Sequence, residues 1–322
     1  MKCGSSAIYT PTSTRNKAGT NRRNERSSYA ITSKHHRCVF FRTGISEFPT
    51  TGHNQNPANA MKSIQQLFDL TGRTAIVTGG GTHLGTAFTE ALCDLGAKVY
   101  IASRRAELCE QVAESLRGRG MDVIGLGCDV TNEAQVDALV ERVMNDTGRL
   151  DIAVCNAGGS FTTSYPPNAD IDEFRQTLEI NLTGTYITAQ SAGRAMIPAK
   201  RGSIITLGSI ASTLSMDPRI YNSEFKRSGP PYIAAKGGVL NLTRAMAAEF
   251  GEHGITANCI SPGQIPRDDT NKAQVETFRK MIPLQRTGLS QDLKGTVALL
   301  ASDAGAWITG QEFRVDGGWS IW

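Results

Sequence analysis

The chain of 322 residues lacks any long hydrophobic run. No stretch approaches the ~20 consecutive apolar residues that a membrane-spanning helix requires. The composition, 39% hydrophobic and 20% charged, is ordinary for a globular protein. We therefore predict no membrane association and enough chain for one large domain or two modest ones.

The sequence also has few candidate metal ligands, and these are scattered. It contains seven cysteines and five histidines. No pair shows a CxxC or zinc-ligand spacing, and most of the cysteines fall in segments that look buried. These features predict reduced thiols, as in the cytoplasm, and no metal site.

Acidic residues are scarce at the start of the chain. Residues 1–60 hold nine Lys and Arg but only two Glu, and they show no apolar periodicity. This composition predicts a disordered basic extension. It is either a dispensable segment before an initiating Met61 or a transit peptide to an organelle matrix. Basic and aromatic residues do not interleave there, so we do not expect nucleic-acid binding.

From residue 61 onward, short apolar runs alternate with helical patterns, which predicts a single domain over 61–322. The predicted strands cover 74–78, 98–102, 121–127, 150–155, 203–207, 255–260 and 311–315. The predicted helices run from the glycines after 78 through 95 and over 105–117, 132–146, 172–197, 231–251, 272–281 and 291–301. Strands that are apolar on both faces belong in a parallel sheet covered on both sides. The pattern thus predicts an α/β doubly wound sheet, the Rossmann fold.

A glycine-rich turn follows the first predicted strand, over Thr78–Gly85. Glycines between a strand and a helix let the backbone approach a pyrophosphate, whose charge the helix N-terminus meets. Glycine turns also occur for geometric reasons alone, so this motif by itself is a moderate indication of a dinucleotide.

The second predicted strand ends in Ser103, followed by Arg104 and Arg105. An acidic residue at this strand end would bind the ribose hydroxyls of NAD. A small Ser103 beside arginines leaves room for the 2′-phosphate of NADP and supplies guanidinium groups to bind it. We therefore predict NADP rather than NAD, although the arginines could be a solvated first helical turn.

With the glycine turn, six further motifs occur in a characteristic order. They are Cys128-Asp129-Val130, Asn156-Ala157-Gly158, Asn181, Ser209, Tyr232 to Lys236, and Ser261-Pro262-Gly263. Together they resemble the short-chain dehydrogenase/reductase family over residues 68–322. The resemblance implies NAD(P)-dependent hydride transfer between an alcohol and a carbonyl.

The resemblance also implies a catalytic tetrad of Asn181, Ser209, Tyr232 and Lys236. Tyr232 and Lys236 are four residues apart on a predicted helix and so share a face. A tyrosine hydroxyl titrates near ~10, and a neighbouring ammonium should lower its pKa so that it exchanges protons at neutral pH. Ser209 would hydrogen-bond the same substrate oxygen, and Asn181 would anchor a water relay beyond Lys236.

The remaining implied residues bind the cofactor. Asp129 would contact the adenine, and Asn156 to Gly158 would brace the central strand and the adenosine half. In addition to Tyr232 and Lys236, the implied cofactor residues are Thr78, Gly79, Gly81, Leu84, Gly85, Ser103, Arg104, Asp129, Val130, Asn156, Ala157, Gly158, Pro262, Gly263 and Ile265.

The glycine turn departs from the family pattern at two positions. His83 stands where glycine is usual, and Thr82 replaces a basic residue that is often present. We expect His83 to be a packing or substrate-mouth residue. Thr82 removes one possible phosphate contact.

The second half of the chain departs from the pattern in two further places. Ser209 and Tyr232 are 23 residues apart, about ten more than is usual in the family. The additional polar segment should shape the substrate pocket, and its Tyr221 is not the catalytic tyrosine because Phe225, not Lys, follows four residues later. Arg267 stands where a threonine often meets the cofactor amide. It could pair with Asp268 or bind an acidic substrate, and residues 264–286 should form a mobile lid.

Three segments resemble gluconate- and polyol-type dehydrogenases: the start at 67–72, the segment 218–221 and the ending Asp316 to Trp319. We expect a sugar acid or a polyol as substrate. A 3-oxoacyl-carrier-protein reductase is the alternative enzyme, and a non-catalytic cofactor-binding sensor is the alternative from another class. The family resemblance also implies a homotetramer that packs through the helices around 175–197 and 231–250.

Overall fold

A computed structural model describes residues 61–161, 163–221 and 227–322, so the predictions for residues 1–60 and for Phe225 lie outside it. The described chain contains one parallel sheet of seven strands in the order β3-β2-β1-β4-β5-β6-β7. The strands are β1 (Thr74–Thr78), β2 (Lys98–Ser103), β3 (Val123–Gly127), β4 (Ile152–Cys155), β5 (Gly202–Leu207), β6 (Ile255–Pro262) and β7 (Glu312–Val315). The strand order reverses between β1 and β4, which is the position where α/β sheets of this kind bind ligands.

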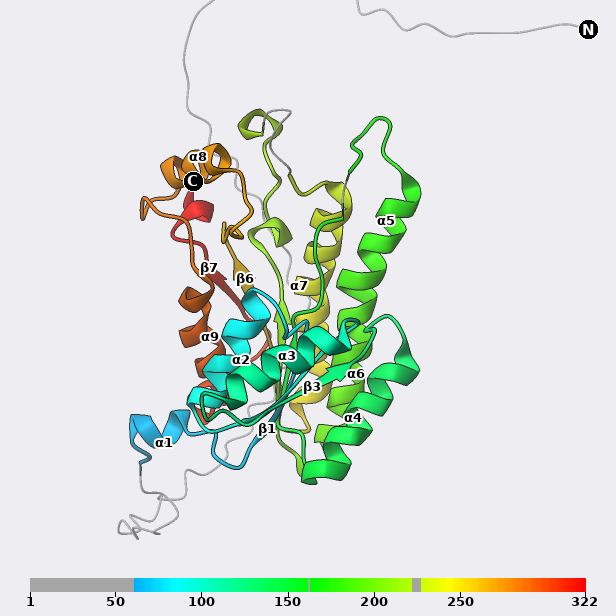
Figure 1. Cartoon of the computed structure of the whole chain (residues 1–322), viewed down its shortest axis with the longest axis vertical. Helices are drawn as coiled ribbons and strands as arrows, with labels where there is room; N and C mark the ends of the chain where they lie inside the picture. The colour runs from blue at the N-terminus through cyan, green and yellow to red at the C-terminus, as the bar shows by residue number, and fades with distance from the viewer. Residues whose placement is uncertain (1–60, 162, 222–226) are drawn as a thin grey trace, which may run out of the picture. The chain divides into compact units, whose positions relative to one another are not determined.

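Helices cover both faces of the sheet (Figure 1). They are α1 (Ile64–Phe68), α2 (Leu84–Asp94), α3 (Ala106–Arg117), α4 (Glu133–Thr147), α5 (Ile171–Leu178), α6 (Gly184–Met196), α7 (Pro230–Gly251), α8 (Lys272–Met281) and α9 (Lys294–Ala301). Helices α2, α3 and α9 pack on one face, whereas α4, α6 and α7 pack on the other. The prediction of a doubly wound Rossmann fold is therefore confirmed.

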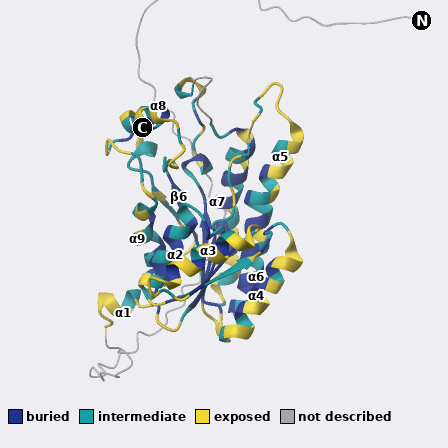
Figure 2. Cartoon of the chain, in the orientation of Figure 1, coloured by how far each residue is buried: buried dark blue, intermediate teal, exposed yellow. Residues whose placement is uncertain are grey.

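Successive residues of the central strands bury their side chains on opposite faces. In β1, Val77 packs in the cluster with α2 and α9, and Ile76 packs in the cluster with α4 and α6. Both side chains are at most 1% exposed, and Figure 2 shows the strands buried between helices whose outer faces are exposed. Burying one such side chain stabilises the fold by about 1.5–3 kcal/mol, which explains why these strands are apolar throughout.

The sequence predicts one continuous helix over 172–197, and this prediction is wrong in the middle of that segment. A π-helical turn at Glu179–Thr183 separates α5 from α6. The side chain of Asn181 donates from Nδ2 to the Thr177 carbonyl at 2.9 Å, so it occupies the acceptor that an α-helix would use for the Asn181 backbone. π-helical turns are frequent at functional sites, and this one contains a residue of the predicted tetrad.

Several other element boundaries differ by one or two residues from the sequence prediction, and two of them have a clear physical reason. The third strand begins at Val123, because the Met121 N–H turns back to the Leu116 carbonyl of α3 at 3.2 Å and does not join the sheet. The helix predicted over 291–301 starts as a 3₁₀ turn at Ser290–Leu293 before α9. Neither of these two differences moves a residue of the predicted site.

Candidate active site

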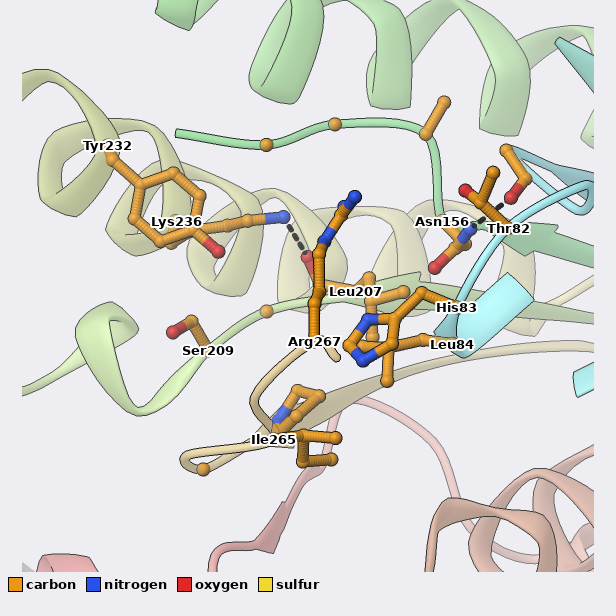
Figure 3. A pocket seen from close by; sticks show the side chains of 17 residues that line it. Thr82, His83, Leu84, Asn156, Leu207, Ser209, Tyr232, Lys236, Ile265 and Arg267 are labelled. Atoms are coloured by element: carbon orange, nitrogen blue, oxygen red, sulfur yellow. Dashed lines mark hydrogen bonds between the residues drawn. The ribbon is translucent and has the colours of Figure 1, made fainter. Parts of the chain in front are cut away.

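The structure brings Tyr232, Lys236 and Ser209 around one cavity at the carboxyl end of the sheet (Figure 3). Tyr232 and Lys236 lie on the first turns of α7, and Ser209 lies two residues after β5. We name this space of ≈ 260 Å³ the central cavity. The glycine turn and the segment that follows β4 also line it, so the candidate catalytic residues and the candidate cofactor-binding residues surround one space.

Lys236 is held in place by burial and by one backbone contact. Its residue is 4% exposed, and Nζ donates to the Leu207 carbonyl at 2.6 Å, which ties α7 to the end of β5. Nζ lies 5.6 Å from the centroid of the Tyr232 ring. Burial disfavours the charged ammonium and lowers the pKa of Lys236 to about 8.

The pKa of Tyr232 shifts in the direction opposite to the sequence prediction. Burial raises the pKa of Tyr232 above its ordinary value, and a hydrogen-bonding interaction with Ser209 opposes this rise only in part. Lys236 is not among the groups that shift the Tyr232 pKa here, and its Nζ donates to the Leu207 carbonyl. A pKa above the ordinary value leaves the Tyr232 hydroxyl protonated at pH 7, the form that can donate a proton.

Ser209 is fixed by the turn that it begins. It is the N-cap residue of the 3₁₀ turn Ile210–Ser212, and its Oγ accepts a hydrogen bond from the Ala211 N–H at 3.1 Å. Its own N–H donates to the Ser212 hydroxyl at 3.1 Å. These contacts hold Ser209 at a wall that the central cavity shares with a second cavity, the one lined by Tyr221 and Phe278.

Asn181 does not line the central cavity; it is 0% exposed behind it. Its Oδ1 accepts from the Gly159 N–H at 3.0 Å, and its Nδ2 donates to the Gly159 carbonyl at 2.9 Å. Asn181 therefore fixes the segment after β4, which forms one wall of the site. Its role in a water relay stays a prediction.

The glycine turn is braced against the end of β4. Asn156 donates from Nδ2 to the carbonyls of Thr78 at 2.9 Å and Gly79 at 3.1 Å, and the Ala157 N–H donates to the Thr78 hydroxyl at 3.2 Å. Gly79 has φ +66°, and a Cβ there would lie 2.8 Å from Asn156 Nδ2. Only glycine permits this approach, so the turn leaves the open backbone cradle that a pyrophosphate requires.

Most predicted cofactor residues line two adjoining cavities. In the central cavity they are Gly79, Leu84, Asn156, Ala157, Gly158, Tyr232, Lys236, Pro262, Gly263 and Ile265. The second space, of ≈ 560 Å³, we name the Arg104 cavity, and its predicted residues are Gly79, Gly81, Ser103, Arg104, Asp129, Val130, Ala157 and Gly158. Thr78 and Gly85 are buried beneath the turn and line neither cavity.

A third space, the lid cavity of ≈ 540 Å³, opens between Tyr232 and α8. Tyr221 lines it, and its ring packs edge-on to Phe278 of α8 at 5.9 Å between centroids. Phe278 in turn packs edge-on to Trp319 near the end of the chain at 5.8 Å. Tyr221 is thus part of the wall of the lid cavity.

Sequence reasoning missed Phe161 and Ile180, which line the Arg104 cavity. Ile180 lies in the π-helical turn, where a regular helical period gives the wrong direction for a side chain. Phe161 lies in a loop without a recognisable motif. No pattern in the sequence could have identified either residue.

His83 adopts a backbone conformation that is rare for a residue with a side chain. Its φ is +46° and its ψ is −114°, at the position where the family usually has glycine. Such conformations cost on the order of 1–3 kcal/mol and persist mainly at functional sites. Its side chain lines both the central and the lid cavity, as expected for a residue at the substrate mouth.

The strain at His83 predicts an unusual order of stabilities. His83→Gly should unfold with a free energy about 1 kcal/mol higher than His83→Ala, because glycine adopts this conformation without strain. Urea denaturation of the two variants measures the difference. At Thr82, where φ is not positive, the order should reverse and Ala should be the more stable. A His83→Ala protein that is the more stable of its pair would show that the backbone is not strained there.

Comparison with known proteins agrees with this geometry. A family model described as enoyl-(acyl carrier protein) reductase matches residues 81–320. Galactitol 2-dehydrogenase from Rhizobium johnstonii is 34% identical over 267 residues, which cover 81% of this chain and 100% of that protein. A 3-oxoacyl-[acyl-carrier-protein] reductase from Synechocystis is 32% identical over 251 residues, covering 77% of this chain and 97% of that protein.

A solved structure shows the same fold with bound ligands. The gluconate 5-dehydrogenase from Burkholderia cenocepacia, in complex with NADP and tartrate, superposes with a TM-score of 0.73 at 30% identity and covers 80% of this chain and 99% of that one. Sequence and fold therefore point to the same family. The chain belongs to the short-chain dehydrogenase/reductase family and is an NAD(P)-dependent oxidoreductase acting on CH–OH groups.

Proposed function

We propose that the protein is an NADP-dependent dehydrogenase of a polyol or a sugar acid. The observation that carries the substrate class is the polar wall of the lid cavity next to Tyr232. Among its polar lining residues are His83, Tyr221, Arg227, Ser228, Gln264, Asp269, Thr270, Asn271 and Gln274. A substrate with several hydroxyls needs many hydrogen-bonding partners once it leaves water, and this wall supplies them.

The preference for NADP rests on the Arg104 cavity. There the last residue of β2, Ser103, is followed by Arg104 and Arg105. The Ser103 hydroxyl accepts from the Arg105 N–H at 3.2 Å and contacts the Cys109 thiol at 3.1 Å, so it is turned into the start of α3. This arrangement leaves space for a phosphate beside two guanidinium groups. The gluconate 5-dehydrogenase of similar fold was solved with NADP.

We propose a role in the reaction for three of the tetrad residues. When bound, the cofactor supplies or accepts the hydride. In carbonyl reduction, Tyr232 donates its phenolic proton to the substrate oxygen, and Ser209 holds the same oxygen by a hydrogen bond. In alcohol oxidation the step runs in reverse, and the Tyr232 phenolate accepts the proton of the substrate hydroxyl. Lys236 stabilises the phenolate that remains after donation, from the position that the Leu207 carbonyl gives it.

One observation favours a second candidate, 3-oxoacyl-carrier-protein reduction. Arg227 lies at the lid cavity with its guanidinium 4.2 Å from the centroid of the Tyr165 ring, and a basic group at this place could meet an acidic carrier. The Synechocystis relative carries that name. The lid cavity is nevertheless more polar than an acyl chain requires, so we rank this candidate second.

A substrate screen tests the proposal. Polyols, sugar acids and 3-oxoacyl thioesters are each incubated with NADP(H) and with NAD(H), and the absorbance of the reduced cofactor is followed. We expect a polyol or a sugar acid with NADP to give the highest kcat/KM. Faster turnover of the thioesters would establish the second candidate, and no turnover of any of the three classes would favour a non-catalytic sensor.

Three other features are part of this proposal. We propose a single catalytic domain over 61–322 and a homotetramer that packs through the α5–α6 and α7 helices, where Tyr186 of α6 is 44% exposed.

In the described residues no helix is both long and apolar enough to span a membrane. We propose a cytoplasmic location, or an organelle matrix if residues 1–60 are a transit peptide.

A further inference from the structure

Arg267 extends from the loop after β6 into the space between the catalytic residues and the glycine turn (Figure 3). A closed turn fixes its backbone: the Arg267 N–H donates to the Thr270 hydroxyl at 2.9 Å, and the Thr270 N–H donates to the Arg267 carbonyl at 3.0 Å. Within the described residues, its guanidinium has no hydrogen bond or ion pair. The pairing with Asp268 considered from the sequence does not form. The guanidinium is thus available to a ligand.

Arg267 lines the central cavity, the Arg104 cavity and the lid cavity. Thr82 lines the first two of these from the opposite side, in the glycine turn. The central cavity holds the catalytic residues, and the Arg104 cavity holds the candidates for the 2′-phosphate. An extended dinucleotide that reaches from one to the other places its pyrophosphate between them, where Arg267 and Thr82 face each other.

The glycine turn supplies little positive charge to this place. Thr82 is neutral, and the pKa of His83 is lowered, first by burial and then by the nearby Arg267, so the imidazole is uncharged at pH 7. Helix α2 offers its N-terminus, with no acidic residue in its first turn. The described residues of the glycine turn therefore offer a pyrophosphate no cationic side chain of their own.

We propose that Arg267 binds the cofactor pyrophosphate from the lid side and replaces the basic residue that position 82 lacks. The positive charge that the family often has in the glycine turn is here on the loop after β6, at the opposite wall of the central cavity. Because Arg267 is on the loop that also lines the lid cavity, cofactor binding fixes one wall of the substrate site. The proposal rests on NAD(P) use by the family and is independent of which substrate the protein takes.

Binding of cofactor fragments tests this assignment. Calorimetry measures the dissociation constants of NADP⁺, ADP-ribose and 2′-AMP for the wild type, Arg267→Gln and Arg104→Ala. We expect Arg267→Gln to weaken NADP⁺ and ADP-ribose alike, by about 10-fold, and to leave 2′-AMP unchanged, because only the first two contain a pyrophosphate. Arg104→Ala should show the reverse pattern, weakening NADP⁺ and 2′-AMP but not ADP-ribose.

Two further measurements keep the test independent of folding and of catalysis. Arg267→Lys should recover part of the lost affinity, because a charge remains without the bidentate geometry. Amide hydrogen exchange of residues 264–271 should slow when NADP⁺ binds to the wild type and less so in Arg267→Gln at equal occupancy. If Arg267→Gln binds NADP⁺, ADP-ribose and 2′-AMP as the wild type does but has a raised KM for the substrate, Arg267 contacts the substrate and the proposal is overturned. A selective loss of 2′-AMP would overturn it in favour of the 2′-phosphate.

Discussion

Replacing Tyr232 with Phe is expected to lower kcat by about 10³-fold, because general acid–base groups contribute on the order of 10²–10⁴ to such reactions. This loss corresponds to about 4 kcal/mol of transition-state stabilisation. The variant loses only the phenolic oxygen, while the ring keeps its packing beside Lys236. Steady-state kinetics with the best substrate from the screen measures the effect.

Two controls show whether the loss belongs to the chemical step. The dissociation constant of NADP⁺ for Tyr232→Phe should stay within about threefold of the wild type, since the variant keeps the cofactor cavities. Tyr221→Phe removes the same atom from the wall of the lid cavity. It should act mainly on KM and lower kcat by less than about threefold. A Tyr232→Phe enzyme that retains wild-type kcat would exclude Tyr232 as the acid/base.

Replacing Arg104 with Ala is expected to lower kcat/KM with NADP by on the order of 10- to 100-fold while changing kcat/KM with NAD little. A charge-assisted hydrogen bond contributes about 1.5–3 kcal/mol, and the 2′-phosphate is present only in NADP. Arg104 is exposed at the Arg104 cavity, so its loss should not disturb folding. Parallel kinetics with both cofactors measure the ratio.

The neighbouring residues provide matched variants for this prediction. Arg105→Ala removes an equal charge from the same cavity at the N-cap of α3, and a smaller loss there would identify Arg104 as the principal contact. Ser103→Asp should move the preference toward NAD, because a carboxylate repels the 2′-phosphate and accepts hydrogen bonds from the ribose. A wild-type protein that strictly prefers NAD would exclude the role assigned to Arg104.

The sequence predicted the architecture because the relevant signals are local. Val77 and Ile76 are neighbours that both had to be apolar, and this repeated pattern indicates a parallel sheet covered on two faces. The predicted positions of the strands agree with the structure within a few residues. The exceptions, such as Met121, lie at element ends, where one backbone hydrogen bond decides the boundary.

The sequence also indicated the residues of the tetrad, although not their arrangement. Tyr232 and Lys236 are related by one helical turn, which spacing alone describes. The place of Asn181 behind the wall of the site depends on a π-helical turn that helical periodicity does not predict. The direction of the Tyr232 pKa depends on how deeply both residues are buried, and burial is a property of the packed protein.

The sequence by itself thus determined the sheet, the reaction type and the identity of the chemical groups, because helical and strand periods and strand-end motifs are written within a few residues of each other. The tertiary structure alone decided which distant segments face one another. It placed Arg267 opposite Thr82, although 185 positions separate them, and it made Tyr221 a wall of the lid cavity. Contacts of this kind follow from how the strand-end loops converge at one edge of the parallel sheet, which no local pattern specifies.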